Sequence, residues 1–260
     1  MTQSKSSYTI VIPARMKSTR LPRKPLKDIA GKPMVVRVAE RALLTRAQAV
    51  CVACDDEEIA LACENHGIRA IPTSPSCPTG TDRLAEAVAK LDLPDEAVVV
   101  NVQGDEPLIE PQAVDRVAQL LIDSPDCEMA TAAHRITEAA EFFNPNVVKV
   151  VADDLGRALL FSRAPIPWAR DAFAASREKL PEDLPALRHI GLYAYRVRFL
   201  KAFPSWEQSE IEKAENLEQL RAMSRGVKIA LAVLDQPLPP GVDTQEDLER
   251  VRAVFASKGL

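Results

Sequence analysis

A cationic segment follows the first apolar stretch of the chain. Residues 8–12 are apolar and largely β-branched, which is typical of a buried strand. Residues 13–33 then carry seven Lys or Arg side chains and one acid, although the whole chain has a formal charge of −4. Lys binds phosphate as a point charge, and the planar Arg fork pairs with phosphate or carboxylate. Four prolines restrict the segment. We therefore expect an ordered loop that binds a multivalent anion.

This loop matches neither of two glycine-rich phosphate-binding patterns. The sequence contains no GxxxxGK[ST] and no GxGxxG. Any phosphate bound here would be held more by Arg and Lys side chains than by backbone amides. The competing interpretation is a solvated basic surface loop without a ligand.

Two aspartates stand where a phosphate-bound cation could be held. Asp105 follows residues 97–102, the most hydrophobic run, and Asp243 precedes a predicted final helix. Mg²⁺ prefers one or two carboxylates together with phosphate oxygens and waters. The alternatives are a turn aspartate at 105 and a cap-region acid at 243. If the two acids meet beside the basic loop, they predict metal-assisted phosphoryl or nucleotidyl transfer.

Composition indicates an ordinary globular protein. The 260 residues are 47% hydrophobic and 27% charged. No apolar run reaches the length of a membrane span, and the N-terminus MTQSKSS lacks a signal-peptide core, so we expect a cytoplasmic protein. Cys51 and Cys54 form a CxxC, but in a strand their side chains point to opposite faces. We expect buried thiols rather than a metal or redox site.

The elements that must position these residues alternate in type. Expected strands at 8–12, 49–54, 68–71 and 97–102 alternate with expected helices at 34–44, 56–66, 81–91 and 111–122. We expect Asp55 to cap the helix at 56–66. This alternation predicts an α/β fold with a mostly parallel, doubly wound sheet, whose ligands bind at the carboxyl ends of the strands.

The second half is less regular. We expect a strand at 128–134, a hairpin of 147–152 and 158–162, a mobile loop at 171–187, and a strand at 188–195. One amphipathic helix at 211–225, a strand at 227–233 and a helix at 245–257 complete the chain. Thr244 and Asp247 should cap the last helix. We predict a single domain, 1–260, with a β-rich insertion at about 135–200 for substrate and oligomer contacts.

Seven motifs, in order, resemble those of the 3-deoxy-manno-octulosonate (Kdo) cytidylyltransferases, the CMP-Kdo synthetases. The resemblance spans roughly residues 8 to 253. The motifs are PARMKSTRLPRKPL at 13–26, NVQGDEP at 101–107, FNPNVVKVV at 143–151, FSRAPIPW at 161–168, HIGLYAYR at 189–196, ENLEQLR at 215–221 and GVDTQEDLERVR at 241–252. The first is shared by several nucleotidyltransferases, whereas its combination with FSRAPIPW and GVDTQEDLERVR is specific.

The resemblance implies a Rossmann-like nucleotide-diphospho-sugar transferase fold with an insertion used in homodimerisation. It also implies the reaction of CTP with Kdo to CMP-Kdo and pyrophosphate, with Mg²⁺, for lipopolysaccharide synthesis. The site residues that the resemblance implies fall into three groups. Arg15, Arg20 and Lys24 would hold the triphosphate, with Ala14, Thr79, Gly80 and Thr81 near the cytosine and ribose. Asp105 and Asp243 would bind Mg²⁺. Gln103, Arg163, His189, Tyr193 and Glu218 would surround the sugar acid.

The chain departs from the family pattern at one position of the basic loop. Arg23 stands where the family usually has glycine, and Arg does not adopt positive φ at no cost. Either the loop backbone differs here or the position accepts a side chain. The placement of Lys24 depends on which is true.

Other functions remain to be weighed. A sibling enzyme that activates sialic acid or an amino-substituted Kdo would use the same chemistry, and the FSRAPIPW and HIGLYAYR motifs favour Kdo. A hexose-1-phosphate nucleotidyltransferase is disfavoured, because such enzymes start with a glycine-rich loop. A non-catalytic anion- or RNA-binding module is also disfavoured. The chain is acidic, 5% aromatic and without aromatics at 13–33, whereas such modules combine a basic face with stacking rings.

Overall fold

The structure is a computed structural model that describes residues 7–258. The first six residues of MTQSKSS lie outside the described residues. The helices are α1 Met34–Ala42, α2 Glu57–Glu64, α3 Gly80–Leu91, α4 Pro111–Asp123, α5 Ala139–Phe142, α6 Arg170–Ala175, α7 Val197–Ala202, α8 Glu210–Glu215, α9 Gln219–Met223 and α10 Gln245–Lys258. The strands are β1 Tyr8–Ala14, β2 Asp28–Ile29, β3 Lys32–Pro33, β4 Ala49–Cys54, β5 Arg69–Pro72, β6 Val98–Asn101, β7 Met129–Arg135, β8 Lys149–Ala152, β9 Ala158–Ser162, β10 Leu187–Arg196 and β11 Ile229–Leu234.

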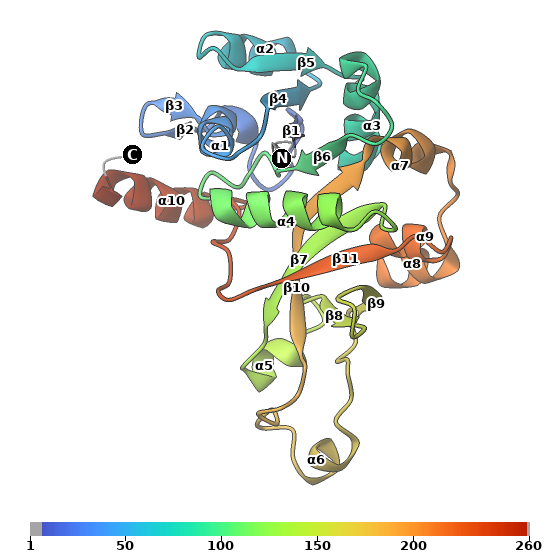
Figure 1. The fold of residues 1–260 in the computed structure, drawn as a ribbon. Coiled ribbons are helices and arrows are strands. Elements are labelled where there is room, and N and C mark those ends of the chain that lie inside the picture. Colours follow the sequence, from blue (N-terminus) through green and yellow to red (C-terminus); the bar gives the residue numbers. More distant parts are fainter. Residues whose placement is uncertain (1–6, 259–260) are drawn as a thin grey trace, which may run out of the picture.

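A mostly parallel sheet runs through the molecule in the order β11-β7-β10-β6-β1-β4-β5 (Figure 1). Strand β1 pairs in parallel with β4 and β6, and β7 pairs in parallel with β11, while β10 runs antiparallel between β6 and β7. The predicted α/β class and mostly parallel sheet are confirmed. Because β1, β4 and β6 are parallel, their carboxyl ends meet at one edge.

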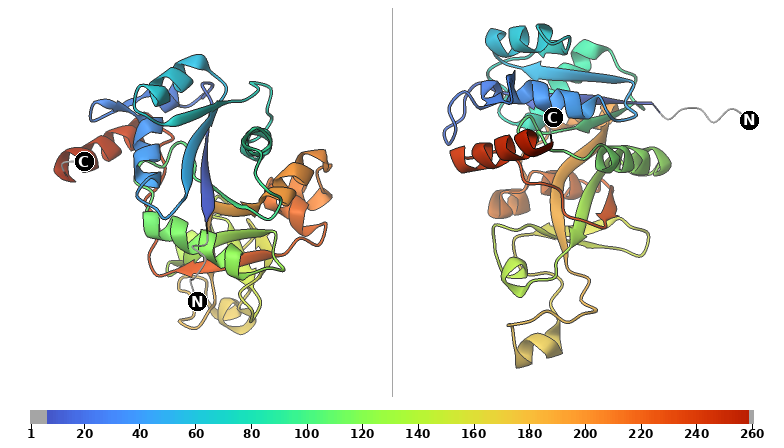
Figure 2. Two further views of the ribbon diagram at one scale, coloured as in Figure 1. Left: turned by 45° about the horizontal axis from the view of Figure 1, so that its top comes forward. Right: turned by 90° about the vertical axis from the view of Figure 1, so that its left-hand side faces the viewer.

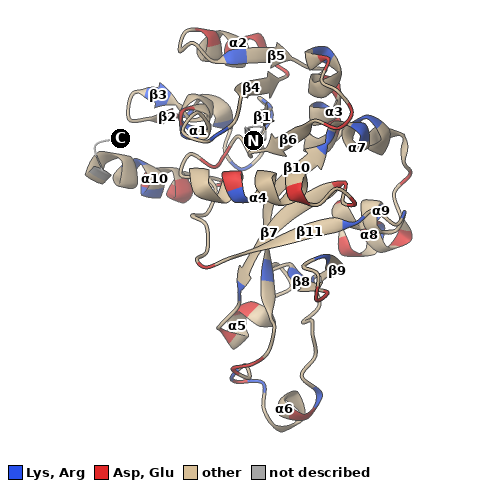
Figure 3. Ribbon diagram, in the orientation of Figure 1, with Lys and Arg blue, Asp and Glu red and all other residues tan. Residues whose placement is uncertain are grey.

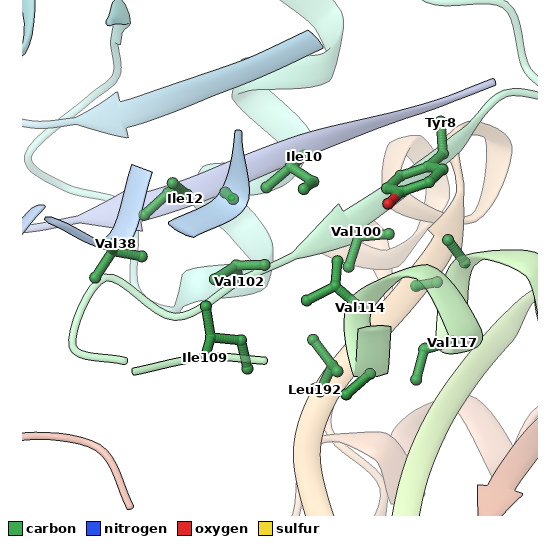
Figure 4. Packing of buried hydrophobic residues seen from close by; sticks show 14 of the residues in the cluster. Tyr8, Ile10, Ile12, Val38, Val100, Val102, Ile109, Val114, Val117 and Leu192 are labelled. Atoms are coloured by element: carbon green, nitrogen blue, oxygen red, sulfur yellow. The ribbon is translucent and has the colours of Figure 1, made fainter. Parts of the chain in front are cut away.

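Helices cover both faces of the sheet. Alternate residues of β1 face opposite layers: Ile10 and Ile12 pack with α1 and α4, while Val11 packs with α3. Figure 4 shows the first layer, in which Tyr8, Ile10 and Ile12 meet side chains such as Val38 and Val114. All three β1 positions from 10 to 12 are fully buried. Each such side chain contributes about 1.5–3 kcal/mol of transfer free energy.

The CxxC behaves as its strand position predicts. Cys51 packs in the layer with α3, and Cys54 packs in the opposite layer. Burial raises the pKa of Cys51 to about 12 and also raises the pKa of Cys54. The prediction of separate, buried thiols is confirmed.

The chain between β7 and β10 extends away from the half of the sheet formed by β6, β1, β4 and β5 (Figure 1). Figure 1 and the right-hand view of Figure 2 both show α6 at the far end of this arm. The arm has its own small core of Ile136, Phe142, Val147, Phe173 and Leu184. Strand β10 leaves the arm and enters the central sheet beside β6. The role of residues 135–200 in substrate and oligomer contacts stays a prediction.

Three local expectations are wrong. The helix at 56–66 is capped by Asp56, whose side chain accepts from the Glu58 amide, and not by Asp55. The helix expected at 211–225 is two helices, α8 and α9, because Asn216 adopts a left-handed conformation that ends α8. The loop expected at 171–187 contains most of α6, whose Phe173 is buried in the arm.

Candidate active site

A cavity of about 690 Å³ opens at the carboxyl edge of β1, β4 and β6. The basic loop, the turn before α3, the loop after β6 and the loop before α10 all contribute to it. Its lining includes nine of the predicted site residues: Ala14, Arg15, Arg20, Lys24, Thr79, Gly80, Gln103, Asp105 and Asp243. Segments separated by more than 200 residues in sequence therefore meet here.

The basic loop is ordered by a small core of its own. Leu21, Ile29 and Met34 are buried against residues of α10 and the preceding loop, including Val242 and Phe255. A 3-10 turn at Lys24–Leu26 and the β2–β3 hairpin complete the loop. Burial of these apolar side chains leaves Arg15, Lys17 and Arg20 exposed around the cavity. The loop is anchored rather than fully solvated.

The two predicted metal carboxylates face one ammonium group. Lys24 Nζ donates to Asp105 Oδ2 at 2.6 Å and to Asp243 Oδ1 at 3.0 Å. Arg20 Nη2 lies 3.0 Å from the same Asp243 oxygen. The two acids and the cationic loop are therefore in direct contact, so groups that could bind a metal ion and groups that could bind phosphate lie at one place.

Backbone contacts hold the two aspartates together. The Val242 amide donates to the Asp105 carbonyl at 2.8 Å, which ties the loop before α10 to the end of β6. Asp247 accepts from the backbone amides of Asp243 and Thr244 at 3.0 and 2.9 Å, and the Asp247 amide donates to Thr244 Oγ1 at 3.2 Å. The predicted Thr244 and Asp247 cap is confirmed. These amide bonds hold the pKa of Asp247 well below its usual range.

The donor set fits a divalent cation that also binds phosphate. In the described part of the chain, no group of three or more His, Cys, Asp or Glu could hold a metal ion. Two carboxylates suit Mg²⁺ when phosphate oxygens and waters complete the shell. Beside them, Glu106 Oε2 is buried without a hydrogen-bond partner among residues 7–258. Burial, together with the neighbouring Asp105, raises the pKa of Glu106 to about 8.

The start of α3 forms the wall opposite these acids. Thr79 caps α3 in a reciprocal capping box with Asp82, and Gly80 is the first helical residue. Deeper in this wall, buried Arg83 donates to Asp55 Oδ2 at 3.1 Å and to Thr73 Oγ1 at 2.6 Å. The other Asp55 oxygen accepts from the Met16 amide at 3.0 Å. Asp55 thus links the basic loop to α3.

Thr81 does not line the cavity. Its hydroxyl donates to Glu218 Oε2 at 2.5 Å, and both side chains border a separate cavity of about 30 Å³ with Tyr193 and Tyr195. The second oxygen, Glu218 Oε1, is buried without a partner among the described residues. Thr81, expected near the nucleotide, therefore contacts Glu218, expected near the sugar.

His189 and Tyr193 lie together on β10. The register of β10 against β7 shifts between Ile190 and Tyr193, and the two rings are 5.3 Å apart. Thr131 donates its hydroxyl to the Leu192 carbonyl at 2.8 Å, so His189 Nε2 is the donor in the 3.0 Å bond to Thr131 Oγ1. Burial lowers the pKa of His189 to about 3. The ring is a neutral hydrogen-bonding group near pH 7.

Arg163 is fixed by backbone carbonyls. Its Nε donates to the Glu215 carbonyl at 2.7 Å and its Nη1 to the Pro145 carbonyl at 3.2 Å. Glu215 also accepts from the Arg163 amide at 2.9 Å. Buried Lys149 donates to the Arg163 carbonyl at 2.6 Å. Five predicted site residues do not line the large cavity: Thr81, Arg163, His189, Tyr193 and Glu218.

Known proteins are similar to this chain in sequence and in fold. A family model described as Cytidylyltransferase matches residues 9–229. The chain belongs to the cytidylyltransferase family. Two curated relatives, from Methylibium petroleiphilum and Leptothrix cholodnii, are named 3-deoxy-manno-octulosonate cytidylyltransferase. The first is 56% identical, covering 97% of each chain, and the second is 55% identical, covering 96% of this chain and 92% of the relative.

Solved structures agree with this family assignment. A structure of CMP:2-keto-3-deoxy-manno-octonic acid synthetase complexed with CTP superposes with a TM-score of 0.88 at 43% identity, covering 97% of this chain and all of that one. A cytidylyltransferase from Leptospira borgpetersenii has a TM-score of 0.60 at 16% identity, covering 96% and 87% of the two chains, and shares the fold. The resemblance to the Kdo enzymes and the nucleotidyltransferase class are confirmed.

Sequence reasoning missed several residues that line the cavity of this cytidylyltransferase. Arg83, Ser18 and Thr19 have no predicted role, and Lys17 is predicted only as one charge of the basic loop, although all of them line the cavity. Asp55 was assigned to a helix cap. Arg83 follows Thr79-Gly80-Thr81 within one helical turn, so helical spacing alone would have placed it on the wall beside Thr79. No local spacing indicates the position of Asp55, because its partners, Met16 in the basic loop and Arg83 in α3, are distant in sequence.

Gly104 lies where the backbone of β1 passes close to the loop after β6. A Cβ at this position would be 2.7 Å from the Pro13 carbonyl oxygen, which belongs to the cavity wall. We expect Gly104→Ala to lower the free energy of unfolding by about 1–3 kcal/mol, as overpacking does, and to weaken CTP binding. Urea unfolding and calorimetric titration with CTP measure the two effects. Gly191→Ala is the control, since the added methyl group would meet nothing within 4 Å beyond its chain neighbours. Equal effects of the two changes would contradict the argument.

Arg23 adopts a left-handed backbone conformation of the kind that glycine favours. Its φ is 57°, and its side chain forms an ion pair with Glu58 at 2.5 Å, outside the cavity. The position therefore accepts a side chain in this conformation, and Lys24, which follows it, reaches the two aspartates.

The cost of the Arg23 conformation can be measured with two variants. Arg23→Gly and Arg23→Ala both remove the exposed ion pair, but only glycine relieves the left-handed strain. We expect the glycine variant to be more stable than the alanine variant by about 1 kcal/mol, after the difference in unfolded-chain entropy is included. Chemical denaturation of both variants measures this difference. An alanine variant at least as stable as the glycine variant would show that residue 23 is unstrained.

Proposed function

We propose that this cytidylyltransferase transfers CMP from CTP to the anomeric hydroxyl of Kdo, giving CMP-Kdo and pyrophosphate. The single observation that carries the proposal is the cavity in which Arg15, Arg20 and Lys24 face Asp105 and Asp243. The likeness to a synthetase complexed with CTP and to two Kdo cytidylyltransferases supports the choice of nucleotide and sugar.

In this mechanism the anomeric hydroxyl attacks the α-phosphorus in line, and pyrophosphate leaves. Arg15, Arg20 and Lys24 bind the triphosphate and stabilise the charge on the leaving pyrophosphate. Ala14 and the Thr79-Gly80 turn hold the nucleoside. Asp105 and Asp243 would hold Mg²⁺, which neutralises phosphate charge and lowers the pKa of the attacking hydroxyl. Catalysis is then mostly positioning and electrostatics.

The sugar acid belongs on the side of β10 in this proposal. Gln103 lines the nucleotide cavity, and neutral His189, whose Nε2 donates to Thr131, can accept a hydrogen bond from a sugar hydroxyl at Nδ1. Arg163 would pair with the sugar carboxylate, with Tyr193 and Glu218 beside it. Because Thr81 bonds to Glu218, the wall that holds the nucleotide is in contact with the sugar side.

The cellular setting is part of the proposal. The reaction would supply lipopolysaccharide synthesis in the cytoplasm, by a homodimer formed through the arm. Among residues 7–258, no helix is long and apolar enough to cross a membrane. Figure 3 shows acidic and basic residues interspersed over the fold, an arrangement that favours an enzyme over a nucleic-acid-binding module with a broad basic face.

Release of pyrophosphate tests the function. The enzyme would be incubated with CTP and Mg²⁺ together with Kdo, with amino-substituted Kdo, with N-acetylneuraminate, or without sugar. We expect release with Kdo and only background release without sugar. Release with the amino-substituted sugar or with N-acetylneuraminate instead of Kdo would assign the chain to a sibling activity. No release with any sugar, from folded protein, would overturn the proposal.

A further inference from the structure

One ammonium group occupies the space between the two aspartates that would hold the metal ion. Lys24 Nζ lies 2.6 Å from Asp105 Oδ2 and 3.0 Å from Asp243 Oδ1. The side chain of Lys24 is only 18% exposed, whereas those of the two acids are 29% and 45% exposed. The carboxylates are thus neutralised from the protein side and open toward the cavity.

The position of this ammonium is held by its backbone. Lys24 begins a 3-10 turn, Pro25 is buried, and the preceding Arg23 is tied to Glu58 on α2. The backbones of the two aspartates are also held, by the bond between the Val242 amide and the Asp105 carbonyl and by the bond from the Asp243 amide to Asp247. Lys24 is therefore a built-in cation of this site and not a mobile surface lysine that meets an acid by chance.

A divalent cation and Lys24 cannot both occupy this position. Two positive charges a few ångströms apart repel strongly in a partly buried site, so a metal ion would have to displace the ammonium. A triphosphate changes the balance, because its oxygens offer Lys24 and Arg20 a larger negative charge than the aspartates do. Arg20 would leave the same Asp243 oxygen that Lys24 leaves.

We propose that Lys24 is an internal counter-ion that keeps divalent cations off Asp105 and Asp243 until a nucleoside triphosphate binds. Nucleotide binding transfers Lys24 from the carboxylates to the phosphates, and the freed carboxylates then accept the cation that accompanies the nucleotide. The free enzyme is therefore a weak metal binder. This inference deepens the proposed function and rests on it for the identity of the triphosphate.

Binding of Mn²⁺ to the whole enzyme, without sugar so that no turnover occurs, tests this inference. Free Mn²⁺ would be followed by electron paramagnetic resonance with wild type, Lys24→Met and Lys24→Arg. Without CTP, we expect Lys24→Met to bind Mn²⁺ at least about tenfold more tightly than wild type, since the charge between the two carboxylates is gone and only exposed Arg20 still competes for Asp243. Lys24→Arg retains the charge and should stay weak. In wild type, CTP should make Mn²⁺ binding tight, beyond the Mn²⁺ that CTP binds in the absence of enzyme.

Two further measurements separate this effect from general changes in charge or folding. Lys27→Met removes one charge from the same loop at a residue that does not line the cavity, and should change Mn²⁺ affinity by less than about twofold. Lys24→Met leaves Asp105 unpaired and Asp243 paired only with exposed Arg20, so Mn²⁺ alone should raise its Tm, whereas it should barely move the Tm of wild type. A folded Lys24→Met enzyme with unchanged Mn²⁺ affinity would overturn the inference.

Failure of the counter-ion role can be distinguished from failure of the proposed function. Turnover of CTP with Kdo by wild type, together with equal Mn²⁺ affinities of wild type and Lys24→Met, would refute the counter-ion role and leave the function standing. Tighter Mn²⁺ binding by Lys24→Met, without turnover by wild type, would support the counter-ion role and refute the substrate assignment.

Discussion

Asp105→Asn should lower turnover about 1,000-fold while leaving the protein folded. The substitution preserves the size of the side chain and removes the charge that faces Lys24 at 2.6 Å. A metal ion supplies several kcal/mol of transition-state stabilisation, and each 1.36 kcal/mol corresponds to about a tenfold change in rate. Asp105 is one of two carboxylates that would hold it, so losing its charge removes much of that stabilisation.

Pyrophosphate release under saturating CTP, Kdo and Mg²⁺ measures this effect, and thermal unfolding verifies the fold. Asp154→Asn is the matched control, because Asp154 is exposed in the turn between β8 and β9. Its turnover should stay within about twofold of wild type, as expected for a charge far from the site. Unchanged turnover in Asp105→Asn would remove Asp105 from the mechanism.

Lys149→Met should destabilise the protein by about 2–4 kcal/mol, at about 1–3 kcal/mol for each buried acceptor that loses its donor. Lys149 is fully buried and donates to three backbone carbonyls, those of Asn144, Val147 and Arg163, at 2.9, 2.6 and 2.6 Å. Burial lowers the pKa of Lys149, so its replacement recovers some desolvation free energy. The Asn144 carbonyl still accepts from the Val147 amide, so the main cost falls on the Val147 and Arg163 carbonyls. This cost exceeds the recovery, and the net effect is a loss of stability.

Urea unfolding measures the destabilisation, and Lys228→Met is the control. Lys228 pairs with Asp126 at 3.2 Å, and both side chains are well exposed, so its loss should cost less than about 1 kcal/mol. Because Lys149 holds the Arg163 backbone, we also expect the KM for Kdo to rise more than the KM for CTP. Stability and KM values like those of wild type would show that Lys149 neither supports the arm nor positions Arg163.

The alternation of strands and helices in the first half was predictable from the sequence. Hydrophobic periodicity determines which faces of β1, α1 and α3 are buried, and burial follows local spacing. The position of the cationic loop and Asp105 at the carboxyl edge of the sheet was predictable, because each directly follows a buried strand. Asp243 was predictable only as an acid before the last helix, and packing brings it to the same edge. The resemblance to the Kdo enzymes then assigned their roles.

Local pattern was insufficient where a single residue or a distant partner decides the backbone. Asn216 splits the predicted helix at 211–225 by adopting a left-handed conformation, which an amphipathic pattern does not reveal. Phe173 supports α6 in a polar segment without helical periodicity, because the small core of the arm provides its contacts. Asp55 contacts Met16 and Arg83 instead of capping α2.

The sequence by itself determined the fold class, the cationic loop and the identity of the two acids. Only the tertiary structure decided that Lys24 sits between those acids, that Thr81 bonds to Glu218, and that Lys149 holds Arg163. The physical reason is the range of the interactions. Strand and helix signals repeat within a few residues, whereas these contacts join segments brought together only by packing of the sheet and its helices.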